Sequence, residues 1–182
     1  YFKSLGGYSA AKLRRYQDLI DEHISKMHMP VINMLNAKYI IVPSQGQAVP
    51  QRNPEAFGNA WFVDSLVVVN TPNEECAALN GIDLRHTAVL DDDFASFTEG
   101  FVPGNDAAAS IRLSSYAPDA LEYQSFSKKD GTVVFSEIYY PYGWKAYIDG
   151  KAVEHFRVNY ALRALNVPAG NHDIRFEFRP DS

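Results

Sequence analysis

The chain has 182 residues, of which 46% are hydrophobic and 21% charged, a composition that suits one folded domain and argues against disorder. Its net charge of −5, with no basic run longer than Arg14-Arg15, argues against nucleic acid as a partner. Cys76 is the only cysteine, so no disulfide can form within the chain, and no apolar run approaches the ~20 residues that cross a bilayer.

The first predicted element is an amphipathic helix over residues 9–28, capped by Ser9 and ended by Pro30. Charged residues occupy the face opposite the apolar one, and they include an i,i+4 pair of Glu22 and Lys26. The apolar face consists of residues at helical spacing, namely Leu13, Tyr16, Ile20, Ile24 and Met27.

The segment after Pro30 begins with a short helical turn over residues 31–36. The apolar run 38–42 then predicts a buried strand that stops at Pro43. Residues 44–54 are polar and contain a glycine and two prolines, which predicts a hairpin or a loop.

The middle of the chain mixes strands with one short helix. Residues 59–70 carry a strong strand signal in their run of Leu and Val. Thr71 and Glu74 form a capping-box pattern around Pro72, and this pattern predicts a helix that ends near Leu79.

Residues 85–90 predict a modest strand, and the acidic residues 91–109 predict a loop. The run Asp91-Asp92-Asp93 could offer carboxylates to a cation, but it lacks the glycine and the distal Glu of a calcium loop. We therefore favour a solvated acidic loop and predict no metal site.

From Ser110 onward the chain predicts a β meander. Asp149-Gly150 suits a two-residue turn that needs positive φ angles. In the last strand Ile174, Phe176 and Phe178 are expected in the core, and the residues between them in solvent. The predicted strands are 111–116, 121–127, 132–140 (central in a sheet), 144–148, 151–153, 162–167 and 172–179.

The fold class predicted from this pattern is α+β. Short strands with regular turns indicate an antiparallel β-sandwich, jelly-roll-like, with the amphipathic helix and the short helices packed against it. We treat residues 1–182 as a single domain. It comprises a helical segment 1–43, a mixed segment 44–109 and an antiparallel β meander 110–182.

No catalytic constellation stands out. The five histidines are scattered, and His23 and His28 are five residues apart, which differs from the i,i+4 spacing of two ligands on one helix face. Cys76 lies in the predicted helix without a nucleophile signature, and His172 follows a turn, where surface hydrogen bonding is the simpler interpretation. We predict no catalytic residue, no metal and no cofactor.

The aromatic residues between strands are candidates for ligand contacts, because aromatic rings stack on sugar C–H faces while polar neighbours bond the hydroxyls. Tyr140, Tyr142 and Tyr147 are the aromatic candidates. Trp144 shares strand parity with Ile148, which favours the core for its ring.

Asn159, Tyr160 and Arg163 complete the candidate glycan site as polar contacts from the adjacent strand. A structural alternative is equally open for the arginines, since Arg157 and Arg163 could pair with Asp149 or Glu154 instead.

Short motifs occur in order along almost the whole chain, and together they resemble the YfhO family of bacterial polytopic membrane proteins. The C-terminal motifs are Tyr140-Pro141-Tyr142-Gly143-Trp144, Asp149-Gly150, Arg157-Val158-Asn159-Tyr160, Leu162-Arg163 and Pro168-Ala169-Gly170-Asn171-His172. The N-terminal motifs are Gly6-Gly7-Tyr8, Ala11-Lys12-Leu13 with Tyr16-Gln17-Asp18, Asn33-Met34-Leu35-Asn36-Ala37-Lys38-Tyr39 and Gly58-Asn59-Ala60-Trp61-Phe62.

That resemblance implies a placement. Proteins of this family have many transmembrane helices and a soluble extracytoplasmic region just before the last one. We interpret the chain, which starts at Tyr1 rather than Met, as that region alone. Its implied partner is the transmembrane region of its own full-length protein, and its implied location is the extracytoplasmic (periplasmic or cell-surface) face of the cell membrane.

The resemblance also implies a chemistry. Family members are similar to glycosyltransferases that use lipid-linked sugars, and some are linked to glycosylation of cell-envelope polymers such as lipoteichoic acid. Their acidic catalytic residues lie on loops between early transmembrane helices, so no catalytic residue carries over to this chain.

Our leading hypothesis is therefore a non-catalytic extracytoplasmic domain that assists the handling of glycan or lipid-linked sugar. The alternatives are an autonomous carbohydrate-binding β-sandwich module and a structural protein-interaction domain.

Overall fold

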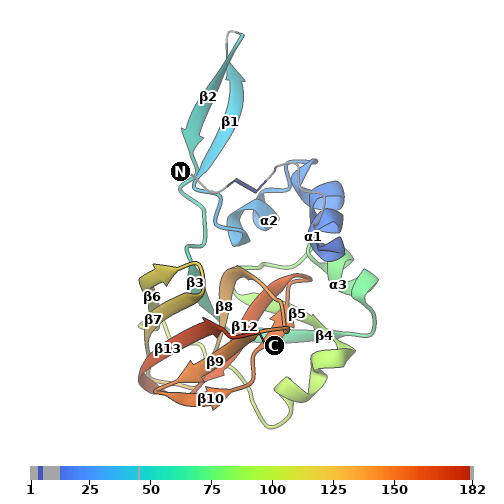
Figure 1. Ribbon diagram of the computed structural model, residues 1–182. Helices are drawn as coiled ribbons and strands as arrows, with labels where there is room; N and C mark the ends of the chain where they lie inside the picture. The colour runs from blue at the N-terminus through green and yellow to red at the C-terminus, as the bar shows by residue number, and fades with distance from the viewer. Residues whose placement is uncertain (1–3, 6–12, 45, 181–182) are drawn as a thin grey trace.

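The computed structural model describes residues 4–5, 13–44 and 46–180, and it places two antiparallel sheets and a helical layer against one another (Figure 1). The five-stranded sheet contains, in spatial order, β10 (Lys151–Val153), β9 (Trp144–Ile148), β13 (Gly170–Phe178), β7 (Ala120–Ser127) and β6 (Ser110–Ala117). The four-stranded sheet contains β11 (Phe156–Val158), β12 (Leu162–Val167), β8 (Gly131–Ile138) and β3 (Ala60–Val63).

The remaining elements form the helical layer and a hairpin. The helices are α1 (Arg14–Leu19), the π-helix η1 (Ile20–Ile24), α2 (Met29–Met34), α3 (Pro72–Ala78) and the 3-10 helix η2 (Asp92–Thr98). The strands are the parallel pair β4 (Ser65–Val69) and β5 (Thr87–Asp91), and the antiparallel hairpin β1 (Tyr39–Ser44) and β2 (Gln47–Arg52).

The two sheets enclose one hydrophobic core between them. Its aromatic centre is Tyr123, Phe135 and Phe176, whose rings meet edge to face at centroid distances of 4.9–6.4 Å. Such contacts add about 0.5–1.5 kcal/mol per pair beyond the burial of apolar area. The predicted α+β class with an antiparallel sandwich is therefore confirmed.

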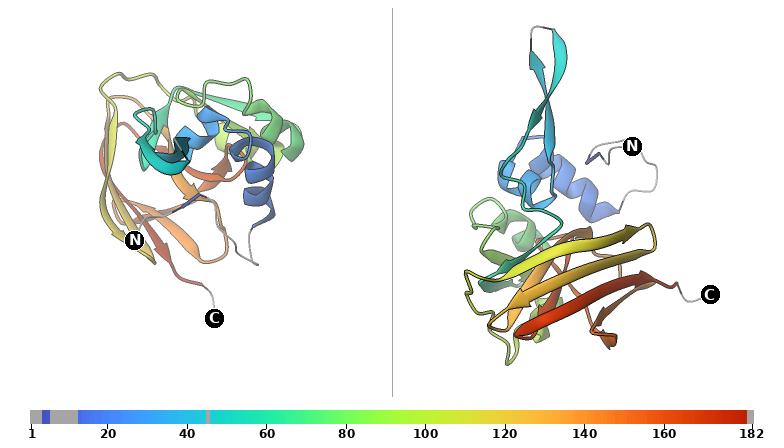
Figure 2. Two further views of the ribbon diagram at one scale, coloured as in Figure 1. Left: turned by 90° about the horizontal axis from the view of Figure 1, so that it is seen from above. Right: turned by 90° about the vertical axis from the view of Figure 1, so that its left-hand side faces the viewer.

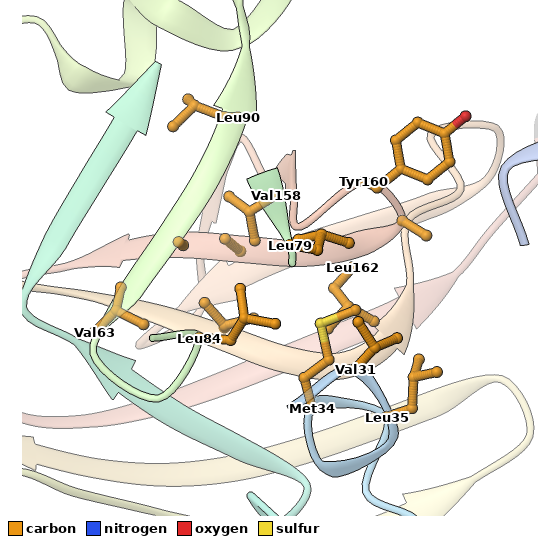
Figure 3. Packing of buried hydrophobic residues seen from close by; sticks show 14 of the residues in the cluster. Val31, Met34, Leu35, Val63, Leu79, Leu84, Leu90, Val158, Tyr160 and Leu162 are labelled. Carbon is orange, nitrogen blue, oxygen red and sulfur yellow. The ribbon is translucent and has the colours of Figure 1, made fainter. Parts of the chain in front are cut away.

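The second core lies on the other face of the four-stranded sheet, where the helical layer covers it (Figure 3). Val31 and Met34 of α2, and Leu35 directly after it, lie beside Leu162 of the sheet, while Val158 lies next to Leu79. Residues 131–135 of β8 are buried without interruption, because apolar layers cover both faces of this strand. Its predicted central position in a sheet is confirmed.

The N-terminal helical segment differs from its prediction in two ways. The described helix starts at Arg14 and passes into η1, while the predicted start and its Ser9 cap lie outside the described residues. Pro30 does not end a helix but opens α2, because its missing N–H is harmless in the first turn.

The strand predicted to be buried at residues 38–42 is exposed instead. It forms β1 of a hairpin that extends away from the body, and it runs through Pro43 to Ser44 (Figures 1 and 2). Its apolar run did indicate a strand, but in the described structure only β2 pairs with it, so Tyr39, Ile41, Pro43 and Ser44 are exposed and Ile40 and Val42 are half-buried.

The single strand predicted over residues 59–70 is two strands in different sheets. The chain changes direction at Asp64, so that β3 joins the four-stranded sheet and β4 pairs in parallel with β5. The predicted cap of α3 is confirmed, since Thr71 Oγ1 accepts a 3.2 Å hydrogen bond from the backbone N–H of Glu74.

The region predicted as an acidic loop, 91–109, is partly ordered into helix η2, and its first residue ends a strand. Asp91 is 1% exposed because two arginines neutralise it inside the protein. The prediction of a solvated carboxylate was therefore wrong for Asp91, whereas Asp92 and Asp93 are exposed.

The C-terminal meander follows its prediction closely, with β11 as an additional short strand. Asp149 and Gly150 have φ angles of 50° and 77°, as the two-residue turn requires. The end of the last strand is different: Phe178 is 38% exposed, while Glu177 is buried between Arg175 and Arg179. The sheet ends here, and the two guanidiniums cover the Glu177 carboxylate.

Candidate functional site

A polar groove of about 410 Å³ lies at one end of the five-stranded sheet. The strands β6, β7 and β13 of this sheet face the viewer in the right-hand view of Figure 2, and no other described element covers their outer face there. We call it the outer-sheet groove. Its lining residues are Ser110, Ile111, Arg112, Gln124, Ser125, Phe126, Asp149, Asn171, His172 and Asp173.

The strand register explains why this lining is polar. Arg112 on β6, Gln124 on β7 and Asp173 on β13 are direct cross-strand neighbours, so their side chains project from the same outer face. The guanidinium of Arg112 donates to Oε1 of Gln124. A basic, an amide and an acidic group therefore stand in one row across the groove.

The next row along the same strands adds an aromatic ring. Phe126 is the cross-strand neighbour of Ser110 on one side and of Asn171 on the other. Its side chain is half-buried, so part of the ring faces the groove. An aromatic surface thus lies beside hydrogen-bonding groups, which is the combination that carbohydrate ligands use.

Asp149 and His172 close one end of the groove. Asp149 Oδ2 lies 2.6 Å from His172 Nδ1, and Asp149 Oδ1 accepts a 2.9 Å hydrogen bond from the backbone N–H of Asp173. These contacts lower the pKa of Asp149, and the hydrogen bond from His172 is the largest cause. The same hydrogen bond raises the pKa of His172. The predicted surface hydrogen bonding of His172 is confirmed.

A second groove, of about 520 Å³, is lined by residues of α2, of the loop before β3 and of the loop before β5. Arg85 lies over the Phe57 ring at 5.3 Å and donates to the Phe57 carbonyl, so these groups satisfy one another. The lining residues include Asn33, Glu55, Asp83 and Arg85. Arg85 is therefore held at the wall of this groove by its contacts with Phe57.

The structure separates the three tyrosines of the predicted site. Tyr140 and Tyr142 lie on the loop between β8 and β9, where their rings meet edge to face at 5.5 Å. They are 37% and 75% exposed, and neither lines one of the two grooves. Tyr147 lies on β9 beside Arg175 of β13, on the outer face that also carries the groove.

Asn159 and Tyr160 are buried rather than displayed. Both have positive φ angles, 50° and 70°, in the turn between β11 and β12. Asn159 Oδ1 accepts a 2.9 Å hydrogen bond from the N–H of Val89, and the Tyr160 hydroxyl donates a 2.7 Å bond to Asp18. The two side chains join β5 and α1 to the sandwich.

Arg163 is also enclosed, at 2% exposure. Its guanidinium carbon lies 4.3 Å from the Trp144 ring centroid and 5.0 Å from that of Phe176, and Nε donates to the Ile138 carbonyl at 3.3 Å. Burial lowers the pKa of Arg163. The alternative ion pairs of Arg157 and Arg163 with Asp149 or Glu154 are not formed, because Arg157 pairs with Asp91 and Arg163 lies over the Trp144 ring. Trp144 itself is half-buried at the edge of the inter-sheet core.

A buried charge cluster was not predicted from the sequence. It consists of Arg15, Glu75, Asp91 and Arg157, which come from α1, α3, β5 and β11. Arg157 pairs with Asp91, and Arg15 reaches Glu75 and Asp91 at 3.3 Å each. Burial raises the pKa of Glu75 to about 7. The members stand far apart in the sequence, so no spacing rule could have found them.

His23 and His28 meet despite their spacing of five residues. The π-helical backbone bonds Ser25 N to Ile20 O and His28 N to His23 O, which puts i and i+5 on one face. Their Nδ1 atoms are 3.2 Å apart, and His23 Nε2 lies 3.2 Å from the Cys76 carbonyl. Even so, the described residues hold no group of three side chains that could bind a metal ion.

Sequence reasoning missed the residues of the outer-sheet groove. The signal was present in the alternation of Arg112, Gln124 and Asp173, each of which stands at a polar position of its strand. What the sequence lacked was the order of the strands, which brings β6, β7 and β13 side by side.

Fold and groove together define an α+β sandwich domain with an uncovered, polar sheet face. The family described as "Bacterial membrane protein YfhO" matches residues 105–182, which span strands β6 to β13 and every residue of the outer-sheet groove. The predicted resemblance to this family is confirmed over that part of the chain, and it supports a domain of a membrane protein. The comparisons with curated proteins and with solved structures give no match. None of the described helices is long and apolar enough to cross a bilayer.

Proposed function

We propose that this chain is a non-catalytic extracytoplasmic domain of a membrane protein and that it binds carbohydrate of the cell envelope in the outer-sheet groove. One observation carries the proposal: Phe126 lies half-exposed between two cross-strand polar neighbours, on a sheet face that no described element covers. The family match supports the membrane setting.

The chemistry of the groove suits a sugar. One face of a pyranose ring presents C–H groups that pack on an aromatic ring, and its hydroxyls both donate and accept hydrogen bonds. The side-chain amides of Gln124 and Asn171 supply both hydrogen-bond donors and acceptors, and the guanidinium of Arg112 supplies donors only. The volume of about 410 Å³ lies within the range of small-ligand sites.

The proposal of a non-catalytic role rests on the state of the carboxylates. Hydrolysis of a glycoside needs a carboxylic acid with a raised pKa beside a second, ionised carboxylate. Hydrogen bonds hold the pKa of Asp149 below its usual value, so Asp149 does not suit the role of the acid. The carboxylate whose pKa burial raises, Glu75, is 0% exposed within the charge cluster and out of reach of a substrate.

The donor chemistry would then belong to the transmembrane part of the same protein, and this domain would hold a glycan or the sugar of a lipid-linked donor near it. Incubation of the 182-residue chain with nucleotide sugars and aryl glycosides should release no product. Turnover that disappears in Asp149→Asn or Asp173→Asn would contradict the non-catalytic role.

Binding is tested on a glycan array that carries hexose and N-acetylhexosamine oligosaccharides, followed by calorimetry with the best oligosaccharide. Phe126→Ala should weaken binding roughly tenfold or more, because full burial of a Phe side chain against apolar surface is worth about 1.5–3 kcal/mol. Tyr142→Ala is the matched control, since Tyr142 is 75% exposed and lies outside the groove.

A chain that binds no oligosaccharide, or that loses binding in Tyr142→Ala but not in Phe126→Ala, would contradict the groove as the site. Tyr147→Ala tests a third position, which lies outside the groove but on the same sheet face. A partial loss in Tyr147→Ala would indicate a glycan long enough to extend along β9.

A protein-interaction domain is the second candidate. It is favoured by Tyr140 and Tyr142, an exposed aromatic pair outside both grooves. Exposed aromatic residues of this kind often anchor protein partners. Cross-linking in the full-length protein, with a photoreactive residue at position 142, should then capture the protein's own transmembrane region.

A further inference from the structure

The hairpin β1–β2 extends away from the rest of the domain (Figures 1 and 2). Tyr39 is 59% exposed and Ile41 is 70% exposed, so the hairpin displays large apolar side chains to solvent. Neither side chain belongs to the two hydrophobic cores of the described residues. A water-exposed apolar arm of this kind needs an explanation outside the domain itself.

The strand register gives one face of the hairpin a set of exposed apolar side chains, whereas Ile40, Val42 and Val49 lie on the opposite face. Tyr39, Ile41 and Pro43 share one face of β1, and their cross-strand partners on β2 are Arg52, Pro50 and Ala48. All six residues are exposed. We call this surface the apolar hairpin face, and its only charged group is Arg52 at the base of the hairpin.

The two prolines make the hairpin edges poor templates for another strand. A proline has no N–H, so Pro43 and Pro50 fit only the pairs whose N–H groups would point outward from the hairpin. Each open edge therefore lacks one donor that an added strand would need. This argues that a partner contacts the apolar face rather than pairing with an edge.

Charge distinguishes this arm from the body. No Asp or Glu stands between Glu22 and Glu55, whereas the whole chain has a formal net charge of −5. Lys38 immediately precedes β1, and Arg52 ends β2 opposite Tyr39. Two cations thus stand at the base of the hairpin, and Arg52 shares the face of Tyr39.

We propose that the apolar hairpin face lies on the surface of an anionic phospholipid bilayer. Tyr side chains favour the membrane–water interface, and Lys and Arg there extend to lipid phosphates while their alkyl stems stay on the apolar side. Apolar area and attraction to anionic lipid together set the strength of interfacial binding. The family match to a bacterial membrane protein supports a bilayer as the partner of this face. The proposal is independent of carbohydrate binding in the outer-sheet groove.

The experiment uses the purified 182-residue chain and sedimentation with two kinds of vesicle, pure phosphatidylcholine and an equal mixture of phosphatidylglycerol and phosphatidylethanolamine. We expect binding to the anionic vesicles that weakens in high salt. Ile41→Glu should weaken it roughly tenfold or more, because it places a charge on the apolar face. Val102→Glu is the matched control, since Val102 is an 84% exposed aliphatic residue on the loop after η2.

Circular dichroism checks that each variant folds, and sedimentation velocity reports its mass in solution. Absence of vesicle binding by the wild-type chain overturns the proposal. Equal losses in Ile41→Glu and Val102→Glu overturn it too, since they would indicate a general charge effect. A dimer that Ile41→Glu dissociates, without vesicle binding, would assign the face to a second copy of the chain instead.

A double variant, Lys38→Gln with Arg52→Gln, separates the two components of the proposed contact. It should remove most of the preference for phosphatidylglycerol and leave the apolar face intact. Unchanged discrimination between the two kinds of vesicle would overturn the role of the basic residues.

Discussion

The backbone N–H of Tyr160 donates a 2.9 Å hydrogen bond to Oε1 of Glu75, a carboxylate that is 0% exposed. The two residues are 85 positions apart, and their contact joins helix α3 to the turn between β11 and β12. Oε2 of the same carboxylate lies 3.3 Å from Arg15 of α1. One buried acid thus links the helical layer to the sandwich, and its protonation affects how firmly the two are joined.

We predict that Glu75→Gln changes the pH dependence of stability. Burial raises the pKa of Glu75 from 4.5 to about 7, so between these values the folded state holds a proton that the unfolded state has released. This group therefore makes the free energy of unfolding fall as the pH rises from about 4.5 to about 7. The glutamine variant cannot ionise and should lack this fall, which amounts to roughly 3 kcal/mol.

Urea unfolding of both proteins at pH 5, 6, 7 and 8 gives the measurement. The difference in unfolding free energy between variant and wild type is the relevant quantity, because contributions from the histidines cancel in it. If that difference stays constant with pH, the carboxylate is ionised throughout and the proposed cause is wrong.

A second prediction concerns the charge at the centre of the cluster. Asp91 pairs with Arg157 and lies 3.3 Å from Arg15, so Asp91→Ala leaves two guanidiniums with less counter-charge inside the protein. Breaking a buried ion pair costs about 3–5 kcal/mol. The neighbouring Asp92 is exposed, and Asp92→Ala should change the unfolding free energy by less than about 0.5 kcal/mol. Equal losses of unfolding free energy in the two variants would show that the buried ion pairs of Asp91 do not stabilise the protein.

These two aspartates also show where sequence reasoning was sufficient and where it failed. The C-terminal strands and the Asp149-Gly150 turn were predictable, because alternation and turn chemistry are local properties of the chain. The burial of Asp91 was not, since it depends on Arg157, which stands 66 positions later. Local patterns identify elements, and they do not identify their distant partners.

The exposed hairpin and the outer-sheet groove illustrate the same limit. The run 38–42 has the composition of a buried strand, and only the arrangement of the domain leaves it in solvent. In the sequence, Arg112 and Asp173 look like ordinary surface residues, and only the strand order shows that they lie in one row. The family resemblance could be recognised from the sequence, because a family match over residues 105–182 needs no knowledge of how the strands pack.

A third prediction concerns the histidine of the groove. Asp149→Asn should keep the turn, because Asn tolerates the φ of 50° at this position, but it removes the charge beside His172. The pKa of His172, which the hydrogen bond to Asp149 raises, should therefore fall toward its ordinary value of 6.5. The stabilisation from this pair is present below pH 6.5 and is lost as the pH rises through the raised pKa, so the variant should lose stability mainly at acid pH. Titration of the His172 ring protons by NMR gives the pKa, and an unchanged value would rule out the contact in solution.

A final prediction separates a structural from a ligand-binding role for Arg163. Its planar guanidinium stacks on Trp144 and Phe176, and a lysine ammonium cannot reproduce this stacking or the hydrogen bond to the Ile138 carbonyl. Arg163→Lys should therefore lower the unfolding free energy by about 1–3 kcal/mol and leave glycan binding in the groove unchanged. Arg175→Lys, on the exposed outer face, is the control, with an expected loss below about 0.5 kcal/mol. Weaker glycan binding by Arg163→Lys at unchanged stability would show instead that its side chain reaches the ligand.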